Sequence, residues 1–450
     1  MHIAKTIFVI LEVLLLFNLL IVVHELGHFL AAKWRGLIIE RFAIWFGPAL
    51  IKKTVNGIEY RLGCIPAGGY VALPQMGAME TIEGKTELAR HGDVSPLDKA
   101  IVAAAGPAFS FLLAVILATV VWAVGRPVSS SDMTTRVGYV FKGEPAALAG
   151  MQAGDTILEV DGNKVSRFAA NGHVGETIVW NIAATPHETI PILIDRNGSR
   201  LTLTVSPIAP ERAGIGRKYL KQIGILPFGI PRVAKAIPGK PAAVAGIKSG
   251  DYLLSANGTP LLSAMMLRDF MDAETGEKPI LFSVRTGDVT RDVEVMPAIP
   301  KGENLPRIGI EWDLRGETTN YHQLPGAQIY GSFMTVVKTV EALFSKGTGV
   351  NVSHLSGPVG IMRVYYLLFE SPEGWRLVLW FSVLLNVNLA VMNLLPLPVL
   401  DGGHIVMAGF EAWRGKPLSR GVMEAMGLCC AVVLLGFMLY VSFYDVLDIF

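Results

Sequence analysis

The sequence of 450 residues is poor in charge and in cysteine, and both scarcities exclude classes of protein. Charged side chains make up 17% of the residues and hydrophobic ones 51%, which is too apolar for an ordinary soluble enzyme. The net charge of +1 gives no support for nucleic-acid binding, so no nucleic-acid partner is expected. Cys64, Cys429 and Cys430 are too few for a disulfide framework and lack the C-x-x-C spacing of thiolate metal sites. A membrane protein is the class that remains.

Four long apolar runs predict membrane-spanning helices, at residues 1–35, 99–125, 373–403 and 421–447. A span needs about 20 apolar residues, and each run supplies them. The first run could be mistaken for a signal peptide, but Glu12 interrupts it and cleavage would discard two histidines, so a retained span is expected. Residues 322–372 carry apolar side chains at helical spacing together with Lys338 and Glu341, which favours amphipathic helices on the membrane surface.

Basic residues predict the orientation of these spans. The region after the first span and the connection between the third and fourth are both rich in them: Lys33, Arg35, Arg41, Lys52, Lys53, Arg61, Lys85, Arg90 and Lys99 in the former, and Arg414, Lys416 and Arg420 in the latter. An even number of crossings places both regions on one side, which the positive-inside rule makes cytoplasmic. Both termini and residues 126–372 are then expected outside the cytoplasm.

The cytoplasmic loop, residues 36–98, contains a predicted β region. Residues 40–46 partly alternate, and residues 58–62 follow Asn56-Gly57, a strong hairpin turn signal. Gly68 and Gly69 precede Tyr70 and permit close approach of another backbone. An ordinary hairpin is the simplest interpretation, whereas a sheet edge close to a catalytic motif would offer its backbone to an extended peptide. Residues 75–98 are polar and predict a mobile loop.

An internal repeat lies between the second and third spans. The pattern P-A-x-x-A-G, followed by Gly-Asp, begins at Pro145 and again at Pro241. Each copy predicts a short helix, a tight turn, a strand and an Asx-Gly hairpin, and each unit closes on an Ile-Gly-Ile strand at 223–225 or 308–310. The pattern resembles the PDZ domain in its circularly permuted bacterial form. Two such α+β domains, at 127–228 and 229–315, are therefore expected outside the cytoplasm, with peptide ends as ligands.

The chemistry is predicted to centre on an H-E-x-x-H motif at the end of the first span. His24 and His28 are four residues apart on a helix, so both project from one face and can bind a single metal ion. Glu25 is placed to act on water at that metal. A pair of satisfied surface histidines is the simpler alternative, but ionisable groups at membrane depth are costly and favour a functional reason.

A zinc ion bound by two histidines needs a further protein ligand and an open position for catalysis. Asp401 follows the third span and two prolines, and the predicted topology puts it on the same side of the membrane as the histidines. A turn is the alternative interpretation, because Asp-Gly-Gly is good turn chemistry. His404 is a rival ligand.

These motifs together resemble the site-2 protease family of intramembrane zinc metalloproteases, in the bacterial type that regulates an envelope stress response. H-E-x-x-H, the motif N-x-x-P-x-P-x-x-D-G from Asn393 to Gly402, and tandem permuted PDZ domains all occur in order across the chain. The resemblance implies one Zn²⁺ per chain, with His24, His28 and Asp401 as its ligands and Glu25 as general base. It implies substrate contacts by six further residues: Asn393, Pro396, Pro398, Gly68, Gly69 and Tyr70. The last three resemble the family's membrane-reentrant β loop.

The resemblance also implies the setting. The expected fold is a polytopic α-helical protein of the bacterial inner membrane, with the active site near the cytoplasmic side and the PDZ domains in the periplasm. The expected substrate is a single-span membrane protein of the anti-sigma-factor type, trimmed first by another protease, and leftover signal peptides are a further candidate. Two alternatives stay open: a catalytically inactive PDZ-bearing membrane scaffold, and a metal transporter, which would usually show more spans and repeated halves in the membrane.

Overall fold

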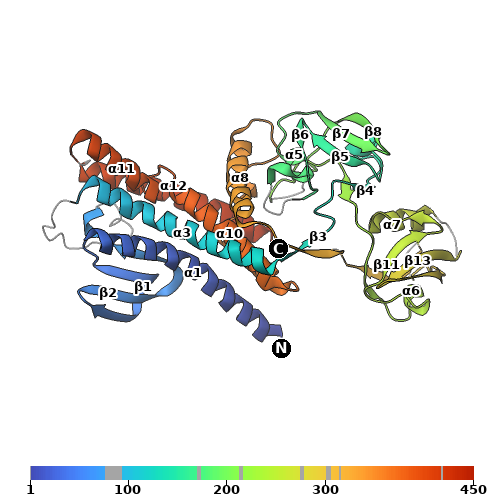
Figure 1. Ribbon diagram of the computed structural model, residues 1–450, viewed down its shortest axis with the longest axis horizontal. Helices are drawn as coiled ribbons and strands as arrows, with labels where there is room; N and C mark the ends of the chain where they lie inside the picture. Colours follow the sequence, from blue (N-terminus) through green and yellow to red (C-terminus); the bar gives the residue numbers. More distant parts are fainter. Residues whose placement is uncertain are drawn as a thin grey trace. The chain divides into compact units, whose positions relative to one another are not determined.

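The computed structural model describes residues 2–76, 94–169, 174–211, 216–273, 278–300, 306–313, 316–416 and 419–449 (Figure 1). The chain divides into two compact units. The first comprises Met1–Arg126, His322–Val336 and Val352–Phe450, and the second comprises Pro127–Tyr321 and Val337–Asn351. Each unit therefore has its own internal framework.

Helices make up most of the first unit. They are α1 (His2–Arg35), α3 (Pro96–Val124), α9 (Pro358–Glu370), α10 (Gly374–Asn393), α11 (Asp401–Arg414) and α12 (Arg420–Leu447). Within the described residues, four segments are long and apolar enough to cross a membrane: Phe8–Arg35, Pro96–Val124, Gly374–Asn393 and Gly421–Leu447. The prediction of four such helices is confirmed. Helix α3 contacts α1, α10 and α11, and so lies at the centre of this unit (Figure 1).

The stretch predicted as the third span, 373–403, contains more than one element. Helix α10 ends at Asn393, and a second helix, α11, begins at Asp401. Pro396 and Pro398 lie in the intervening turn, where their missing N–H groups and fixed φ angles stop α10 from continuing. The sequence pattern Asp-Gly-Gly was compatible with a turn, but in the structure it forms the first turn of α11.

Two long strands precede α3. Strands β1 (Arg41–Val55) and β2 (Ile58–Ala72) are antiparallel and joined at Asn56 and Gly57, whose φ angles of 50° and 81° are typical of a type I′ turn. Ala43 is opposite both Arg61 and Tyr70. Residues 41–44 thus lie between two stretches of β2, and 69–72 form an edge of the sheet. Of the predicted mobile loop at 75–98, residues 77–93 lie outside the described part, while η1 (Pro74–Met76) and the start of α3 are ordered elements.

The internal repeat is a repeat of structure in the second unit. The first copy consists of β4 (Val137–Val140), α4 (Pro145–Leu148), β5 (Thr156–Val160), β6 (Asn163–Lys164), α5 (Ile178–Ala183), β7 (Ile190–Arg196), β8 (Ser199–Val205) and β9 (Ile225–Pro227). The second consists of β10 (Val233–Ala236), α6 (Pro241–Val244), β11 (Tyr252–Ala256), β12 (Thr259–Pro260), α7 (Ala264–Ala273), β13 (Ile280–Thr286), β14 (Val289–Val295) and β15 (Ile310–Trp312). The strand orders β6-β5-β7-β8 and β12-β11-β13-β14 are the same, and the closing strands β9 and β15 pair with β4 and β10.

A buried aspartate holds each copy together at the predicted Gly-Asp turn. Asp155, 2% exposed, accepts hydrogen bonds from Arg196 on β7 and from the backbone N–H of Gln152. Asp251 is fully buried and is paired with Arg291 on β14. Charge-assisted bonds of this kind are about twice as strong as neutral ones. The Gly-Asp turn therefore reverses the chain, and its aspartate also binds an arginine on a strand of the sheet.

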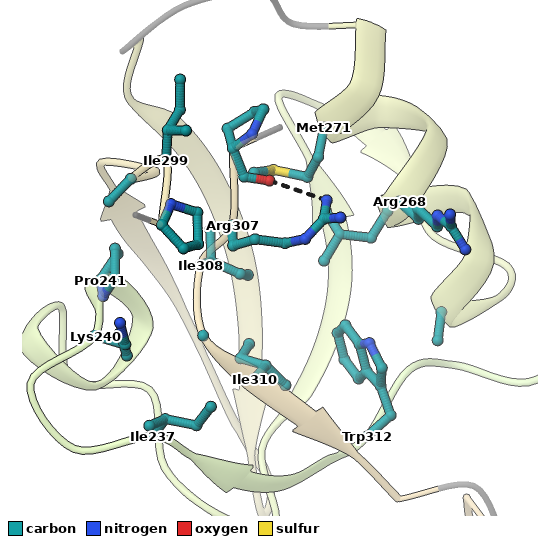
Figure 2. Close-up of a pocket in the computed structure, with 16 residues that line it drawn as sticks. Ile237, Lys240, Pro241, Arg268, Met271, Ile299, Arg307, Ile308, Ile310 and Trp312 are labelled. Atoms are coloured by element: carbon teal, nitrogen blue, oxygen red, sulfur yellow. Dashed lines mark hydrogen bonds between the residues drawn. The ribbon is translucent and has the colours of Figure 1, made fainter. Parts of the chain in front are cut away.

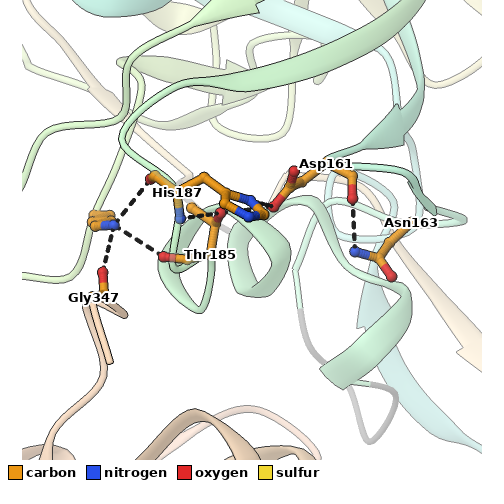
Figure 3. A network of polar contacts seen from close by, with 6 residues as sticks. Asp161, Asn163, Thr185, His187 and Gly347 are labelled. Carbon is orange, nitrogen blue, oxygen red and sulfur yellow. Dashed lines mark hydrogen bonds and ion pairs between the residues drawn. The ribbon is translucent and has the colours of Figure 1, made fainter. Parts of the chain in front are cut away.

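A polar network ties the first copy to the segment after α8 (Pro325–Phe344) (Figure 3). The carboxylate of Asp161 accepts from the hydroxyl of Thr185 at 2.7 Å and contacts Nδ1 of His187 at 2.9 Å. The ammonium group of Lys221 donates to the backbone carbonyls of Thr185, His187 and Gly347. Lys221 thus connects the first copy, through Thr185 and His187, with the segment after α8, through Gly347.

Helix α9 is capped by a side chain from a distant helix. Gly357 precedes α9 and has no side chain with which to accept a hydrogen bond, and the N–H groups of Gly357 and Gly360 both donate to Oδ2 of Asp445 at 2.9 Å. Asp445 belongs to α12 and is 2% exposed. A carboxylate at a helix N-terminus satisfies donors that have no partner within the helix and interacts favourably with its dipole. Asp445 therefore links α12 to α9.

We expect Asp445→Ala to destabilise the chain by about 2–3 kcal/mol, because it leaves two buried N–H groups without their acceptor. Asp445→Asn retains an oxygen at the same place and should lose less than half as much. Unfolding of the purified full-length chain in detergent micelles measures both. Equal losses for the two variants would show that the hydrogen bonds to Asp445 do not determine the stability of this region.

Candidate active site

Helix α1 carries the two histidines into the interior of the first unit. His24 and His28 are 6% and 3% exposed, and their Nε2 atoms lie 3.2 Å apart. Neighbouring apolar side chains, including Phe29 and Ala32, are also buried, so this end of α1 is covered by other elements. The simpler alternative of a surface histidine pair is therefore not what the structure shows.

Asp401 joins the histidines from the first turn of α11. Its carboxylate oxygens lie 3.1 Å from Nε2 of His24 and 3.3 Å from Nε2 of His28, and the three donor atoms lie within 4.8 Å of one another. A tetrahedral zinc site with bonds of about 2.0 Å has edges of about 3.3 Å, which matches these separations. Three buried acceptor atoms converging on one point favour a bound cation. The donor set and spacing therefore fit zinc.

The remaining ring nitrogens of the histidines are held by α3. Nδ1 of His28 lies 2.8 Å from the carbonyl oxygen of Val102, and Nδ1 of His24 lies 3.0 Å from the hydroxyl of Ser110. Because a carbonyl only accepts, Nδ1 of His28 is the donor and its Nε2 carries the lone pair that faces Asp401. Partners of this kind fix the tautomer and orientation of a metal-binding histidine.

Two glycines allow α1 and α3 to come this close. A Cβ atom at Gly106 of α3 would overlap Nε2 of His28 and lie 2.8 Å from Nε2 of His24. A Cβ at Gly27 of α1 would overlap the carbonyl oxygen of Ala105 and lie 3.0 Å from Cβ of Phe109. Small residues permit such close approach between membrane helices. Gly106 therefore leaves free the space that the histidine nitrogens face.

Glycines also position Asp401. Cβ atoms at Gly402 and Gly403 would overlap the carbonyl oxygens of Leu394 and Leu397 respectively. Neither residue has a positive φ angle, so they are needed for their small size and not for a left-handed turn. They allow the start of α11 to fold back against the turn that contains Pro396 and Pro398, and this brings the carboxylate to the histidines.

Two other predicted residues border this cluster. Nδ2 of Asn393, at the last position of α10, lies 3.4 Å from Nε2 of His24, which is a long contact. His404, the rival ligand, is 7% exposed and lies one turn after Asp401 on α11. Among the described residues, the group whose donor atoms converge is His24, His28 and Asp401, and it does not include His404.

Glu25 lies beside the edge of the β1–β2 sheet. Its carboxylate accepts a hydrogen bond from the backbone N–H of Val71 in β2. Its Oε2 atom is buried and has no hydrogen-bond partner within the described part of the chain. A Cβ atom at Gly69 would come within 3.4 Å of Cγ of Glu25. The edge strand 69–72 is therefore adjacent to the proposed base.

The other two residues of the predicted β loop have structural contacts of their own. Tyr70 is 8% exposed, its ring stacks on Phe46 at 5.8 Å, and its hydroxyl accepts from Arg41. Gly68 has a φ angle of 78°, and a Cβ atom there would overlap the ring of Phe46. The side chain of Tyr70 is thus committed to the sheet, whereas the backbone of 69–72 lies at its edge.

Sequence reasoning missed the contributions of Val102, Gly106 and Ser110. The signal that could have pointed to them is the Gly106-Pro107 pair within the second apolar run, because both residue types are unfavourable inside a helix and yet α3 contains them. Their role depends on which helix packs against α1, and periodicity along one chain segment does not reveal that.

Comparison with known proteins gives a consistent picture. The model of peptidase family M50 matches residues 12–437. A protein of Neisseria meningitidis serogroup A, whose name assigns it provisionally to the zinc metalloproteases, is 30% identical over 442 residues, which cover 95% of this chain and 96% of its own. The regulator of sigma-E protease RseP of Escherichia coli is 29% identical over 467 residues, covering 95% and 96%. The metalloprotease MmpA of Caulobacter vibrioides is 29% identical over 470 residues, covering 97% and 96%.

Among solved structures, the PDZ domain of an SdrC-like protein from Listeria monocytogenes is 18% identical, with a TM-score of 0.18. It covers 20% of this chain and 98% of its own.

We expect Gly106→Ala to reduce zinc affinity by at least about tenfold, because the new methyl group occupies the space that the histidine Nε2 atoms face. Gly427→Ala is the matched control, since it makes the same change in α12 where a Cβ atom meets nothing within 4 Å. Elemental analysis of the purified variants at limiting zinc measures the effect. Equal zinc contents would contradict the role assigned to Gly106.

Proposed function

This chain belongs to peptidase family M50 and is a zinc metalloendopeptidase, and we propose that it cleaves single-span proteins within their membrane helix. The observation that carries the proposal is the buried cluster of His24, His28 and Asp401, with Glu25 beside it, among helices apolar enough to span a membrane. Burying ionisable side chains in apolar surroundings costs free energy. Such side chains are therefore expected mainly where they serve a function. Peptide hydrolysis is the function that this set of residues can perform.

The proposed ligands divide between three elements. His24 and His28 come from α1 and Asp401 from α11, while α3 orients both imidazoles through Ser110 and Val102. A zinc ion bound there supplies a Lewis acid and makes water nucleophilic near neutral pH. His24, His28 and Asp401 would hold the ion with three protein ligands, the number found in catalytic zinc sites.

Glu25 is the proposed general base. Val71 holds its carboxylate in place through the backbone, and Oε2 is buried without a partner among the described residues, so this oxygen is available to take a proton from the attacking water. The same oxygen then delivers the proton to the nitrogen of the leaving amine. The sheet edge lies beside Glu25, and we assign the entry of the peptide to this side of the cluster.

The substrate must lose helical structure before cleavage. All carbonyls of a membrane helix are hydrogen-bonded within it, and freeing them in an apolar environment is costly. The edge formed by Gly69, Tyr70 and their neighbours offers backbone groups to the unwound strand, in the manner of strand addition. We assign Asn393, Pro396 and Pro398, in the turn between α10 and α11, to contacts that keep the substrate open. An anti-sigma factor is the proposed substrate, and leftover signal peptides are a second class.

The proposed topology places the chain in the bacterial inner membrane with the active site near the cytoplasmic side. Both termini and the two structural repeats are then periplasmic. The identical strand order of the repeats and their closing strands β9 and β15 support their assignment as two permuted PDZ domains. We propose that they restrict access to substrates whose outer domain has been removed, and that they bind peptide ends.

Cleavage of a tagged single-span substrate with a short outer stub tests this function in cells. Glu25→Gln should abolish the cytoplasmic fragment and retain zinc, because it removes the base but no ligand. His24→Ala and Asp401→Ala should lose both the fragment and most of the zinc. If Glu25→Gln still yields the fragment, the chain is not the peptidase, and an inactive scaffold becomes the better description. Retention of zinc by Asp401→Ala would assign the third ligand to another residue, with His404 first.

Substrate unwinding gives a separate prediction. Replacing one alanine near the scissile bond by glycine lowers helix stability by about 1 kcal/mol, so cleavage should become roughly fivefold faster. The same replacement two turns away serves as the control. A rate that is unchanged at both positions would mean that unwinding does not limit cleavage.

A further inference from the structure

Strand β1 contains a tryptophan in a backbone conformation that bulky residues avoid. Trp45 has a φ angle of 68°, in the left-handed region that favours glycine and that costs other residues free energy. The other tryptophan that belongs to a strand of the described chain, Trp312 of β15, does not have a positive φ angle, and its ring lines a groove between α7 and β15 (Figure 2). Contacts around Trp45 must therefore hold it in this conformation.

Asn18 of helix α1 supplies a polar contact of this kind. Nε1 of Trp45 donates a hydrogen bond to Oδ1 of Asn18 at 2.7 Å, and Asn18 is 6% exposed. An indole N–H only donates, so the oxygen of the amide must face Trp45 and its nitrogen must point the other way. That nitrogen donates to the carbonyl oxygen of Leu14 at 2.7 Å and lies 3.4 Å from the carbonyl oxygen of Pro66 in β2. Asn18 therefore links α1 to β1 and also approaches β2.

Asn18 lies on the face of α1 that also carries Glu25. Ile21 and Glu25 follow it by three and seven residues, and this spacing places the three side chains on one side of a helix. A Cβ atom at Gly69, in the edge strand 69–72, would lie 3.4 Å from Cγ of Glu25 and 3.8 Å from Cγ2 of Ile21. One face of α1 therefore meets the sheet twice, at Trp45 through Asn18 and at Gly69 beside Glu25.

The pairing register of β1 and β2 shifts at Trp45. Ile44 is opposite Gly69 and Phe46 is opposite Ile65, so Trp45 lies between two pairs of different register. An irregularity of this kind is a β-bulge, which bends a strand and often re-aims residues next to an active site. The bend immediately follows the residue that pairs with Gly69. The conformation of Trp45 therefore determines how the edge strand is held beside α1.

We propose that Asn18 is a positioning residue for the peptidase site. By holding Trp45 in the left-handed conformation, it fixes the bulge of β1 and keeps the edge strand 69–72 beside Glu25, where the unwound substrate pairs. A hydrogen bond fixes direction as well as distance, whereas apolar contacts are not directional. Asn18 acts through the sheet, since its hydrogen bonds go to Trp45 and to the backbone. The inference rests on the proposed function and deepens the role given there to the sheet edge.

Cleavage of a tagged single-span substrate by the full-length chain in detergent micelles tests this role. Asn18→Leu suits an apolar segment but cannot accept the hydrogen bond. It should raise KM by at least about fivefold and change kcat by less than about threefold, because the pairing edge is displaced while the base and the zinc ligands remain. Trp45→Phe removes the indole N–H and should act in the same direction. Trp122→Phe is the matched control on α3, at a residue that is 44% exposed, and should leave KM unchanged.

Trp45→Gly provides a rescue that a merely structural role of Asn18 would not give. Glycine adopts a positive φ angle without a steric penalty, so the bulge no longer needs to be held, and the apolar side chain of Asn18→Leu needs no partner. The double variant Asn18→Leu/Trp45→Gly should therefore regain a KM within about twofold of the parent. Zinc content should equal that of the parent in all these variants.

Hydrogen–deuterium exchange of the backbone amides of 69–72 reports on the edge strand without any substrate. Asn18→Leu should speed this exchange by at least about tenfold, because the strand opens more often once the bulge is released. The double variant should restore the exchange rate of the parent.

Four results would overturn the proposal: an unchanged KM in Asn18→Leu, a double variant no better than Asn18→Leu alone, equal exchange in Asn18→Leu and the parent, or loss of zinc from Asn18→Leu. The last result would mean that Asn18 supports the fold as a whole. Absence of cleavage by the parent itself would contradict the proposed function. The exchange comparison would then still decide whether Asn18 positions the edge strand.

Discussion

The first unit depends on the burial of three acceptor atoms that face one another. Nε2 of His24, Nε2 of His28 and the carboxylate oxygens of Asp401 approach to 3.1–3.3 Å, and all three side chains are buried. Such a group is unfavourable without a cation, and its cost is highest in an apolar environment. Helix α3 fixes the orientation of both imidazoles through Ser110 and Val102. The turn after α10 reverses the chain, so that Asp401 at the start of α11 supplies the carboxylate.

Close backbone packing is the common means by which the site is built. Gly27 and Gly106 bring α1 and α3 together, and Gly402 and Gly403 bring α11 against the preceding turn. Hydrophobic burial does not drive association between helices in lipid, so small residues that increase contact area become important. The glycines therefore set the distances, while the histidines and the aspartate supply the chemistry.

Much of this arrangement could be predicted from the sequence. The length of the apolar runs predicted the four apolar helices. The internal repeat predicted two copies of one fold, and the two copies have the same strand order. The spacing of four residues predicted that His24 and His28 lie on one face of a helix. The helix α11 was not foreseen, because Asp-Gly-Gly is also good turn chemistry and its glycines are required by packing. The contacts of Ser110 and Val102, and the hydrogen bond between Trp45 and Asn18, depend on tertiary neighbours that local patterns do not encode.

The carboxylate of Asp445 has a mechanical consequence. Helix α12 is otherwise little buried, and its main contacts are with α9 and η3 (Val352–His354). The two hydrogen bonds that Asp445 accepts from the first turn of α9 fix the contact between these helices at one buried point. Tyr365 of α9 in turn packs with Val9 and Val13 of α1. Helix α9 therefore connects α12 with α1, the helix that carries His24 and His28.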